Sequence, residues 1–150
     1  MYIVSACLAG QNCKYNGGNN ENEQVVKFSK ENDCVLVCPE RFGNLPTPRP
    51  PSEIIGGRAV DKNGKDITEE LLRGARESWE KAEAAAARAG QAIEGAILKA
   101  NSPSCGAGTI YDGAFAGKKI AGDGFFTRLL KEKGIRVVTE EEPFAAWFKV

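Results

Sequence analysis

Five cysteines and the absence of histidine decide which chemistry this chain can carry out. Its 150 residues include Cys7, Cys13, Cys34, Cys38 and Cys105 but no histidine. Histidine is the commonest general base with a near-neutral pKa and the commonest nitrogen ligand of metals, so both roles fall to other side chains. Thiolates without imidazole favour an iron–sulfur cluster, zinc or Cu(I) as a metal centre.

Three of the cysteines follow short apolar segments that we interpret as buried strands. Cys7 follows residues 2–6, Cys38 ends the run 34–38, and Cys105 comes shortly after residues 96–100. The carboxyl ends of parallel strands lie at one edge of a sheet, where ligands commonly bind. We therefore expect Cys7, Cys38 and Cys105 to meet in one crevice and to hold a metal centre.

Zinc is the alternative to an iron–sulfur cluster at this centre. Structural zinc sites usually show two cysteine pairs, each with roughly two to four intervening residues. Here five residues separate Cys7 from Cys13 and three separate Cys34 from Cys38, the latter pair on a predicted strand. Free cysteine also acts as a small buried hydrophobe, which is the role we expect for Cys34. Cys13 lies in a loop rich in glycine and asparagine and fits either role.

Proton transfer at such a centre needs a side chain other than histidine. Glu40 follows Cys38 by two residues in the sequence Cys-Pro-Glu, where a carboxylate could act as general acid or base. Ser102 and Ser104 precede Cys105 and could hydrogen-bond a substrate, although serine is also an ordinary loop residue. A surface glutamate is the usual alternative for Glu40.

The composition argues against several classes of partner. Lys+Arg and Asp+Glu each number 20, so the chain has no net charge to attract nucleic acid or an anionic membrane. The apolar N-terminus is too short to span a bilayer and has no basic residues before it, so we expect no signal peptide. We expect a cytoplasmic protein with reduced thiols and a small-molecule partner. The sequence carries no signal for an oligomeric state.

Strand-like and helix-like segments alternate, which predicts an α/β fold. We expect one domain over residues 1–150, with a mainly parallel sheet flanked by helices and the site at the C-terminal edge of the strands. The expected strands are 2–6, 34–38, 53–60, 96–100 and 135–139. Three helices are expected: one over 21–32, one that begins with a capping box at 66–69 and ends near Gly90, and one from Gly124 to Gly134. Asn63-Gly64 predicts a hairpin turn after residues 53–60. The tail with Trp147 and Phe148 is expected to dock on the body or on a partner.

Four motifs extend beyond the cysteines themselves. They are Ser5-Ala-Cys7-Leu-x-Gly10-x-x-Cys13-x-Tyr15-x-Gly17, Val37-Cys38-Pro39-Glu40-x-x-Gly43-x-Leu45-Pro46-Thr47-Pro48-Arg49, Leu98-Lys99-x-x-Ser102-Pro103-Ser104-Cys105-Gly106 and Ile110-Tyr111-Asp112-Gly113. Together they resemble a small bacterial domain family, long of unknown function, that includes thiouracil desulfidase. The resemblance covers residues 1 to about 139, and the tail 142–150 lies outside it.

The resemblance implies both a cofactor and a reaction. It implies a 4Fe–4S cluster held by Cys7, Cys38 and Cys105, with one iron free to bind the sulfur of a small thiolated substrate. The implied reaction is non-redox desulfuration of the type that converts 2-thiouracil to uracil and sulfide. Glu40 corresponds to the catalytic glutamate of the family, and either Ser102 or Ser104 to its catalytic serine. Cys13 also matches the family pattern and is a further possible ligand.

Two other classes of function remain open on the sequence alone. One is a non-catalytic iron–sulfur or zinc module in which a fourth ligand, Cys13 or Cys34, closes the site. The other is a thiol-redox protein that uses Cys7 with Cys13 or Cys34 with Cys38. The missing Cys-x-x-Cys motif counts against the redox protein.

Overall fold

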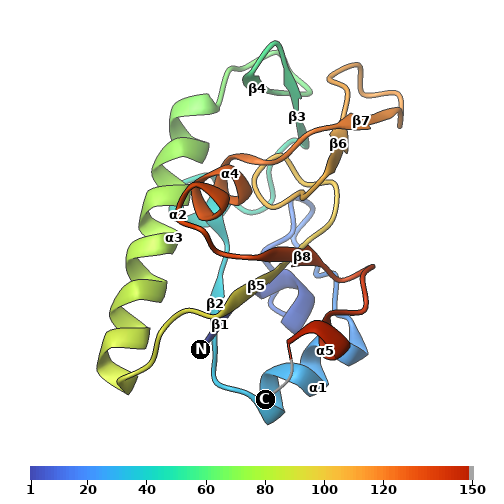
Figure 1. Ribbon diagram of the computed structural model, residues 1–150. Coiled ribbons are helices and arrows are strands. Elements are labelled where there is room, and N and C mark those ends of the chain that lie inside the picture. The colour runs from blue at the N-terminus through green and yellow to red at the C-terminus, as the bar shows by residue number, and fades with distance from the viewer. Residues whose placement is uncertain (149–150) are drawn as a thin grey trace.

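The computed structural model describes residues 1–148 (Figure 1). Within them, the centre is a four-stranded sheet with the strand order β2-β1-β5-β8. The strands are β1 (Tyr2–Ser5), β2 (Cys34–Val37), β5 (Gly95–Leu98) and β8 (Val137–Thr139). Every neighbouring pair is parallel. The predicted α/β fold with a mainly parallel sheet is therefore confirmed.

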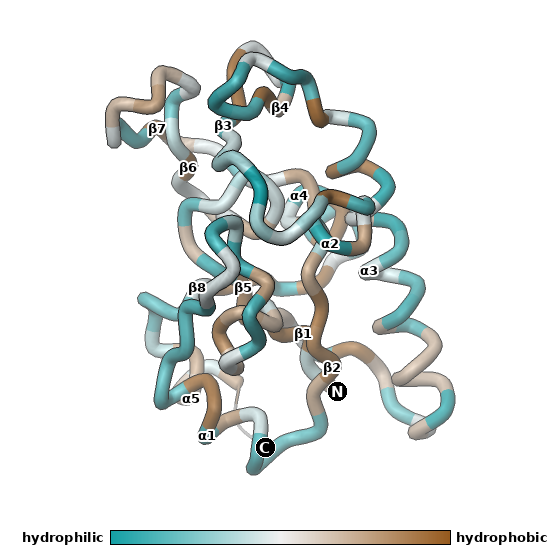
Figure 2. The backbone as a smooth tube through the Cα atoms, turned by 180° about the vertical axis from the view of Figure 1, so that it is seen from behind, coloured by the Kyte–Doolittle hydropathy of each residue, from teal (hydrophilic) through white to brown (hydrophobic). Residues whose placement is uncertain are grey.

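Helices cover both faces of this sheet, because alternate strand residues point to opposite faces. On one face, Ile3 and Leu98 belong to a core cluster with residues of α3 (Thr68–Ala89) and α4 (Phe125–Glu132). On the other face, Val4 and Ile97 pack with residues of α1 (Glu23–Glu31) and α5 (Phe144–Trp147). Figure 2 shows β1 and β2 as a strongly hydrophobic path through the middle of the molecule. Burial on both faces explains why these strands are continuous apolar runs.

Two small hairpins and two short helices lie beyond the C-terminal ends of the central strands (Figure 1). The hairpins are β3 (Ser52–Ile55) with β4 (Arg58–Asp61), and β6 (Thr109–Tyr111) with β7 (Lys119–Ala121). The helices are the 3₁₀ helix η1 (Ala6–Ala9), directly after β1, and α2 (Pro39–Phe42), just after β2. These peripheral elements surround the edge of the sheet at which the sequence placed the site.

The prediction of one strand over residues 53–60 is wrong. The segment folds back on itself, and Ile55 pairs with Arg58 at the end of the β3–β4 hairpin. Gly56 and Gly57 form the turn with φ values of 56° and 78°. Two consecutive residues with positive φ match a tight hairpin turn, which glycine adopts without strain. The Asn63-Gly64 turn also forms, but it connects β4 to the segment before α3.

The predicted capping box before α3 is wrong, whereas the predicted end of that helix is confirmed. The residue before the helix is Ile67, which makes no side-chain cap. The carboxylate of Asp66 instead accepts the N–H of Thr68 at 2.9 Å. At the other end Gly90 is left-handed, with φ 66°, and its N–H bonds to the last turn of the helix. Glycine is favoured there because it has no Cβ.

The C-terminal tail packs on the body of this chain. Phe144 and Phe148 are buried. The ring centroid of Phe148 lies 5.1 Å from that of Tyr2, and the ring centroid of Phe144 lies 5.7 Å from that of Phe28. The tail therefore completes the core on the α1 side, and its last residues, 149–150, lie outside the described part. In that part, no helix combines the length and apolar character needed to cross a membrane.

Candidate active site

The cysteines predicted to converge lie at the ends of three adjacent strands. Cys7 is in η1, directly after β1, and Cys38 lies between β2 and α2. Cys105 lies on the loop that follows β5. Because β1 is the neighbour of both β2 and β5, these three chain segments leave the sheet side by side. All three cysteines line one cavity of about 480 Å³, together with Cys13.

Cys13 is the most closely connected of these four residues. Its side chain is buried, and the thiol of Cys38 donates to its backbone carbonyl oxygen at 3.9 Å. Interaction of its thiol with the sulfur atoms of Cys38 and Cys7, together with burial, raises the pKa of Cys13 far above its ordinary value. The same interaction is the largest influence that lowers the pKa of Cys7, and that lowers the pKa of Cys38 to about 7. The proton therefore stays on Cys13, while Cys7 and Cys38 carry negative charge more readily than ordinary thiols.

The backbone contributes further donors around the sulfurs. The N–H of Arg41, in α2, also lowers the pKa of Cys38, which occupies the position before the first helical residue. A thiolate at a helix N-terminus is favoured in this way. Burial raises the pKa of Cys105, and hydrogen bonds with the hydroxyl groups of Ser5 and Ser104 oppose that effect.

This donor set fits an iron–sulfur cluster, which cysteine thiolates hold and neighbouring hydrogen bonds tune. Cys7, Cys38 and Cys105 are the residues we expect to hold it, with Cys13 as a further candidate. Among residues 1–148, no three Cys, Asp or Glu side chains are arranged to hold a single metal ion. Zinc needs its donors around one ion at roughly 2.0–2.3 Å. In a cluster each thiolate binds a different iron, so a wider arrangement suits it better.

Cys34 lies away from this cavity. It begins β2 and pairs with Tyr2, at the opposite end of the strand from Cys38. Its side chain is half-buried, and burial raises its pKa to about 11. This placement agrees with a structural role and separates Cys34 from the cysteines at the site.

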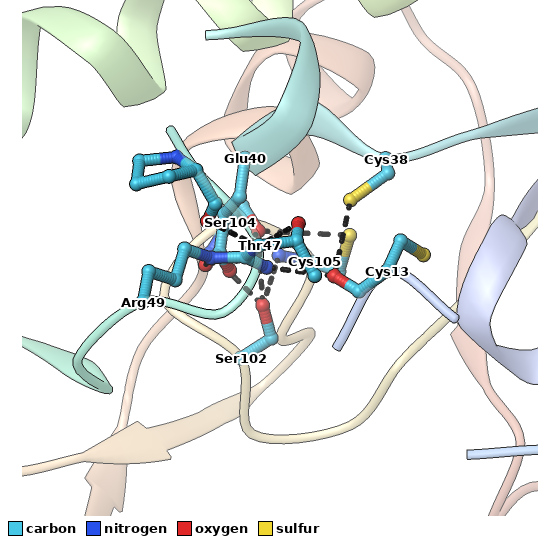
Figure 3. A network of polar contacts seen from close by, with 9 residues as sticks. Cys13, Cys38, Glu40, Thr47, Arg49, Ser102, Ser104 and Cys105 are labelled. Atoms are coloured by element: carbon cyan, nitrogen blue, oxygen red, sulfur yellow. Dashed lines mark hydrogen bonds and ion pairs between the residues drawn. The ribbon is translucent and has the colours of Figure 1, made fainter. Parts of the chain in front are cut away.

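Glu40 lies in the cavity with both carboxylate oxygens hydrogen-bonded (Figure 3). Its Oε1 accepts from Nε of Arg49 at 3.0 Å, and its Oε2 accepts from the hydroxyl of Ser104 at 3.1 Å. The side chain is only 15% exposed. Glu40 is therefore held in one orientation, between a cation and a hydroxyl group, rather than extended into solvent.

The two serines form a hydrogen-bonded chain that leads to Glu40. Ser102 Oγ accepts the backbone N–H groups of Ser104 and Cys105, at 3.1 and 3.0 Å. The hydroxyl hydrogen of Ser102 is then directed to Ser104 Oγ, 3.0 Å away. Ser104 can in turn donate to Glu40, or to the sulfur of Cys105 at 3.9 Å. Ser104 is thus the serine that links the carboxylate to a candidate ligand.

The first turn of α4 holds the loop that carries these serines. The N–H groups of Gly124, Phe125 and Phe126 donate to carbonyl groups of Gly106, Pro103 and Ser104. A Cβ on Gly124 would lie 2.5 Å from the carbonyl oxygen of Ser104, so only glycine allows this approach. In addition, the hydroxyl of Thr127 donates to the carbonyl of Cys105 at 2.9 Å. The unpaired N–H groups of a helix start are thereby used to fix the position of Cys105.

Two cations from the sequence motifs, Arg49 and Lys99, also line the cavity. Arg49 is only 5% exposed and, besides Glu40, donates to the carbonyl of Cys13 at 2.9 Å. Lys99 forms an ion pair with Glu140, with 3.1 Å between Nζ and Oε2. Its charge contributes, after larger influences, to the lowered pKa of Cys7. Neither side chain is simply a solvated surface cation.

Sequence reasoning missed one wall of the cavity. Glu53 of β3, Tyr111 of β6 and Phe115 of the following loop all line it. Tyr111 belongs to the Ile-Tyr-Asp-Gly motif, and this motif could have indicated that Tyr111 is a site residue. Glu53 and Phe115 belong to none of the four motifs. They reach the site only because the two hairpins fold over the end of the sheet.

A parallel α/β domain with cysteines, a carboxylate and serines around one cavity at the C-terminal edge of its sheet has the features of a metalloenzyme. Comparison with known proteins gives the family. The model of the 2-thiouracil desulfurase family matches residues 2–142, and the chain belongs to this family. The uncharacterised protein YbbK of Bacillus subtilis (strain 168) is 43% identical over 152 residues, which cover 95% of this chain and 97% of YbbK.

A solved structure gives the same result for the fold. The 4Fe–4S-dependent thiouracil desulfidase TudS superimposes with a TM-score of 0.81 and is 41% identical in sequence. The match covers 95% of this chain and 91% of the TudS chain. The family resemblance inferred from the four motifs is therefore confirmed, and it covers nearly the whole chain.

Proposed function

We propose that this protein is a 4Fe–4S-dependent desulfidase that replaces the sulfur of a small thiolated nucleobase, such as 2-thiouracil, with oxygen from water. The observation that carries the proposal is the meeting of Cys7, Cys38 and Cys105 with Glu40 in one cavity. Membership of the 2-thiouracil desulfurase family and the likeness to TudS support it.

Cys7, Cys38 and Cys105 would hold the cluster in this proposal. When bound, it supplies a Lewis-acidic iron that attracts the sulfur of the substrate. The overall change is hydrolytic: a thiocarbonyl and water give a carbonyl and hydrogen sulfide. No electrons are transferred, so the protein needs only to place the reactants and to move protons.

Glu40 is the group that we assign to proton transfer. Its carboxylate can take a proton from the attacking water, as a general base does. Ser104 donates to Oε2 of Glu40 and lies within 3.9 Å of the sulfur of Cys105. A proton can therefore pass between the carboxylate and the sulfur side of the cavity through Ser104, with Ser102 behind it. Arg49 keeps the carboxylate in place from the other side.

We place this activity in the cytoplasm, where thiols stay reduced. All five cysteines are free, in agreement with a reducing compartment. The cavity volume of about 480 Å³ suits a small molecule rather than a polymer as substrate.

The test is sulfide release by the anaerobically reconstituted protein. Incubation with 2-thiouracil should yield uracil and sulfide in equal amounts. Glu40→Gln should retain iron and sulfide content yet lose about 100-fold or more in kcat, since general acid–base catalysis contributes about 10²–10⁴-fold. Glu141→Gln, at an exposed position, is the matched control and should leave kcat unchanged. Full activity of Glu40→Gln would remove Glu40 from the mechanism.

One observation favours a second candidate function, a closed cluster that does not act on a substrate. Cys13 lines the cavity together with Cys7 and Cys38, and its carbonyl oxygen lies 3.9 Å from the sulfur of Cys38, so a fourth thiolate is at hand. A cluster with four protein ligands would have no iron free for a substrate. The absence of uracil formation, together with loss of the cluster in Cys13→Ser, would favour this alternative.

A further inference from the structure

A carboxylate outside the proposed proton route fastens one wall of the cavity. Glu53 lies in β3, and its Oε1 accepts the backbone N–H groups of Gly113 and Phe115 at 3.0 and 3.2 Å. The two donors are 60 and 62 positions away in sequence, in the loop between β6 and β7. Hydrogen bonds from backbone N–H to a carboxylate are charge-assisted and strong. Glu53 thus joins the two hairpins that lie beyond the sheet.

The same loop is pressed directly against β3. A Cβ on Gly113 would lie 2.7 Å from Cβ of Ile55 and 3.0 Å from the carbonyl oxygen of Ile54. Gly113 also has φ 95°, which glycine adopts without strain. Two independent features, close contact at Gly113 and the bonds to Glu53, therefore fix the loop in one position.

Phe115 is held in an unfavourable backbone conformation at this place. Its φ is 55°, in the left-handed region that a bulky side chain rarely adopts. Such conformations persist where surrounding contacts impose them, and they cluster at ligand sites. The side chain of Phe115 is half-buried and lines the cavity, as does that of Tyr111. In the same cavity lie the cysteines and Glu40.

We propose that Phe115, positioned by Glu53, is the stacking surface for the planar ring of the substrate. This inference rests on the proposed function and makes it more specific. An aromatic face recognises a flat heteroaromatic ring and tolerates its substituents, because every base has a π-face. The cavity therefore binds thiocarbonyl compounds with a planar aromatic ring more tightly than thiocarbonyl compounds that are puckered or acyclic. Glu53 is a positioning residue in this scheme and acts through Phe115.

The test compares two pairs of ligands, and the members of each pair differ in the C5=C6 double bond and hence in the planarity of the ring. 2-Thiouracil and 5,6-dihydro-2-thiouracil share their thiocarbonyl, and uracil and 5,6-dihydrouracil share their carbonyl groups. In the protein with its reconstituted cluster, KM should be about tenfold lower for 2-thiouracil than for its dihydro form, and Kd about tenfold lower for uracil than for dihydrouracil. Phe115→Leu should reduce both ratios to about one while changing kcat little.

Two variants serve as controls. Phe115→Trp keeps an aromatic face and should preserve both ratios. Ile120→Ala, at an exposed position of β7 outside the cavity, should also preserve them. Ratios that survive unchanged in Phe115→Leu would overturn the inference.

The assignment of Glu53 as a positioning residue is tested by comparing its variants with Phe115→Leu. Glu53→Ala should raise KM for 2-thiouracil nearly as much as Phe115→Leu, and Glu53→Gln, which keeps an acceptor oxygen, should restore most of the loss. The double variant Glu53→Ala/Phe115→Leu should be no worse than Phe115→Leu alone, because residues that act through one another are not additive. Additive losses would show that Glu53 contacts the substrate by itself and would refute its assignment as a positioning residue.

Failure of this inference can be told apart from failure of the proposed function. Calorimetric Kd values for uracil and dihydrouracil need no turnover. A ratio that depends on Phe115, without sulfide release from 2-thiouracil, would uphold the stacking surface and reject desulfuration. Sulfide release from 2-thiouracil, with a ratio of Kd values that does not depend on Phe115, would uphold desulfuration and reject the stacking surface. No measurable binding and no sulfide release would reject both.

Discussion

The guanidinium of Arg49 and the carboxylate of Glu40 form a buried ion pair, with 3.0 Å between Nε and Oε1 and side-chain exposures of 5% and 15%. Arg49 also donates to the carbonyl of Cys13 at 2.9 Å and to the hydroxyl of Thr47 at 3.0 Å. One guanidinium therefore connects the loop of Cys13, helix α2 and the proline-rich segment 46–51. Arginine suits this position because its planar fork offers several fixed donors, which lysine lacks.

Substitution of Arg49 should affect activity and stability differently. Arg49→Lys keeps the charge but cannot reach all three of these acceptors, so Glu40 should shift and kcat should fall by about tenfold or more. Arg49→Met leaves the carboxylate without its partner and should lower the free energy of unfolding by about 3–5 kcal/mol. Sulfide release and urea denaturation measure the two effects.

A second arginine provides the control for this prediction. Arg58 forms an ion pair with Asp66 at 2.9 Å, but both side chains are exposed, at 54% and 45%. Solvent screens such pairs, so Arg58→Lys should change neither kcat nor the free energy of unfolding measurably. Equal effects of the two lysine substitutions would mean that burial and the additional donors of Arg49 are unimportant.

The two serines should differ in their contribution to catalysis. Ser104 contacts both Glu40 and the sulfur of Cys105, whereas Ser102 contacts neither side chain and instead accepts two backbone N–H groups. Ser104→Ala should therefore lower kcat by about 100-fold with little change in KM. Ser102→Ala should lower kcat less and lower stability by about 1 kcal/mol. The opposite order of kcat values would place the reacting hydroxyl at Ser102.

Replacement of Cys13 tests which thiols hold the cluster. Serine keeps a hydrogen-bond donor in place of the Cys13 thiol, whose interaction with the sulfur atoms of Cys7 and Cys38 affects the pKa of all three residues. Cys13→Ser should therefore reconstitute with unchanged iron and sulfide content and an unchanged electron paramagnetic resonance spectrum after reduction. Cys7→Ser, measured in parallel, should lose iron. Equal losses in the two variants would make Cys13 a ligand.

Helix packing far from the cysteines should also control Glu40. A Cβ at Gly74 of α3 would clash with the carbonyl group of Pro39, the first residue of α2. Gly74→Ala should push α2 away and lower the free energy of unfolding by about 1–3 kcal/mol, because tightly packed sites tolerate no added volume. Since Glu40 is the next residue of α2, kcat should fall as well.

Arg76→Ala, two residues along α3 and exposed, is the control for Gly74→Ala. Surface substitutions usually change stability by less than about 0.5 kcal/mol. If both variants retain wild-type kcat, the contact between Gly74 and Pro39 does not determine the position of Glu40.

The parallel sheet could be predicted because its strands carry strong local signals. Residues 2–5, 34–37 and 95–98 are apolar runs of strand length. The end of α3 could also be predicted, because a single glycine, Gly90, in the left-handed region is enough to end the helix. The β3–β4 hairpin was mispredicted because Asn63-Gly64 indicates a turn after residues 53–60, whereas the strand pair reverses at Gly56-Gly57. Both pairs lie in turns, and sequence alone did not show which of them reverses a strand pair.

The sequence by itself determined the chemistry available to this protein: thiolates but no imidazole, and a carboxylate two residues after a cysteine. It also determined that Cys7, Cys38 and Cys105 follow strands, and hence that they could meet. Only the tertiary structure decided that the thiol of Cys38 donates to the carbonyl of Cys13, that Arg49 is buried against Glu40, and that Glu53 holds Phe115 at the cavity. Those contacts join residues 9 to 62 positions apart, and one partner of each lies in a loop, where the chain has no periodicity from which a pairing could be read.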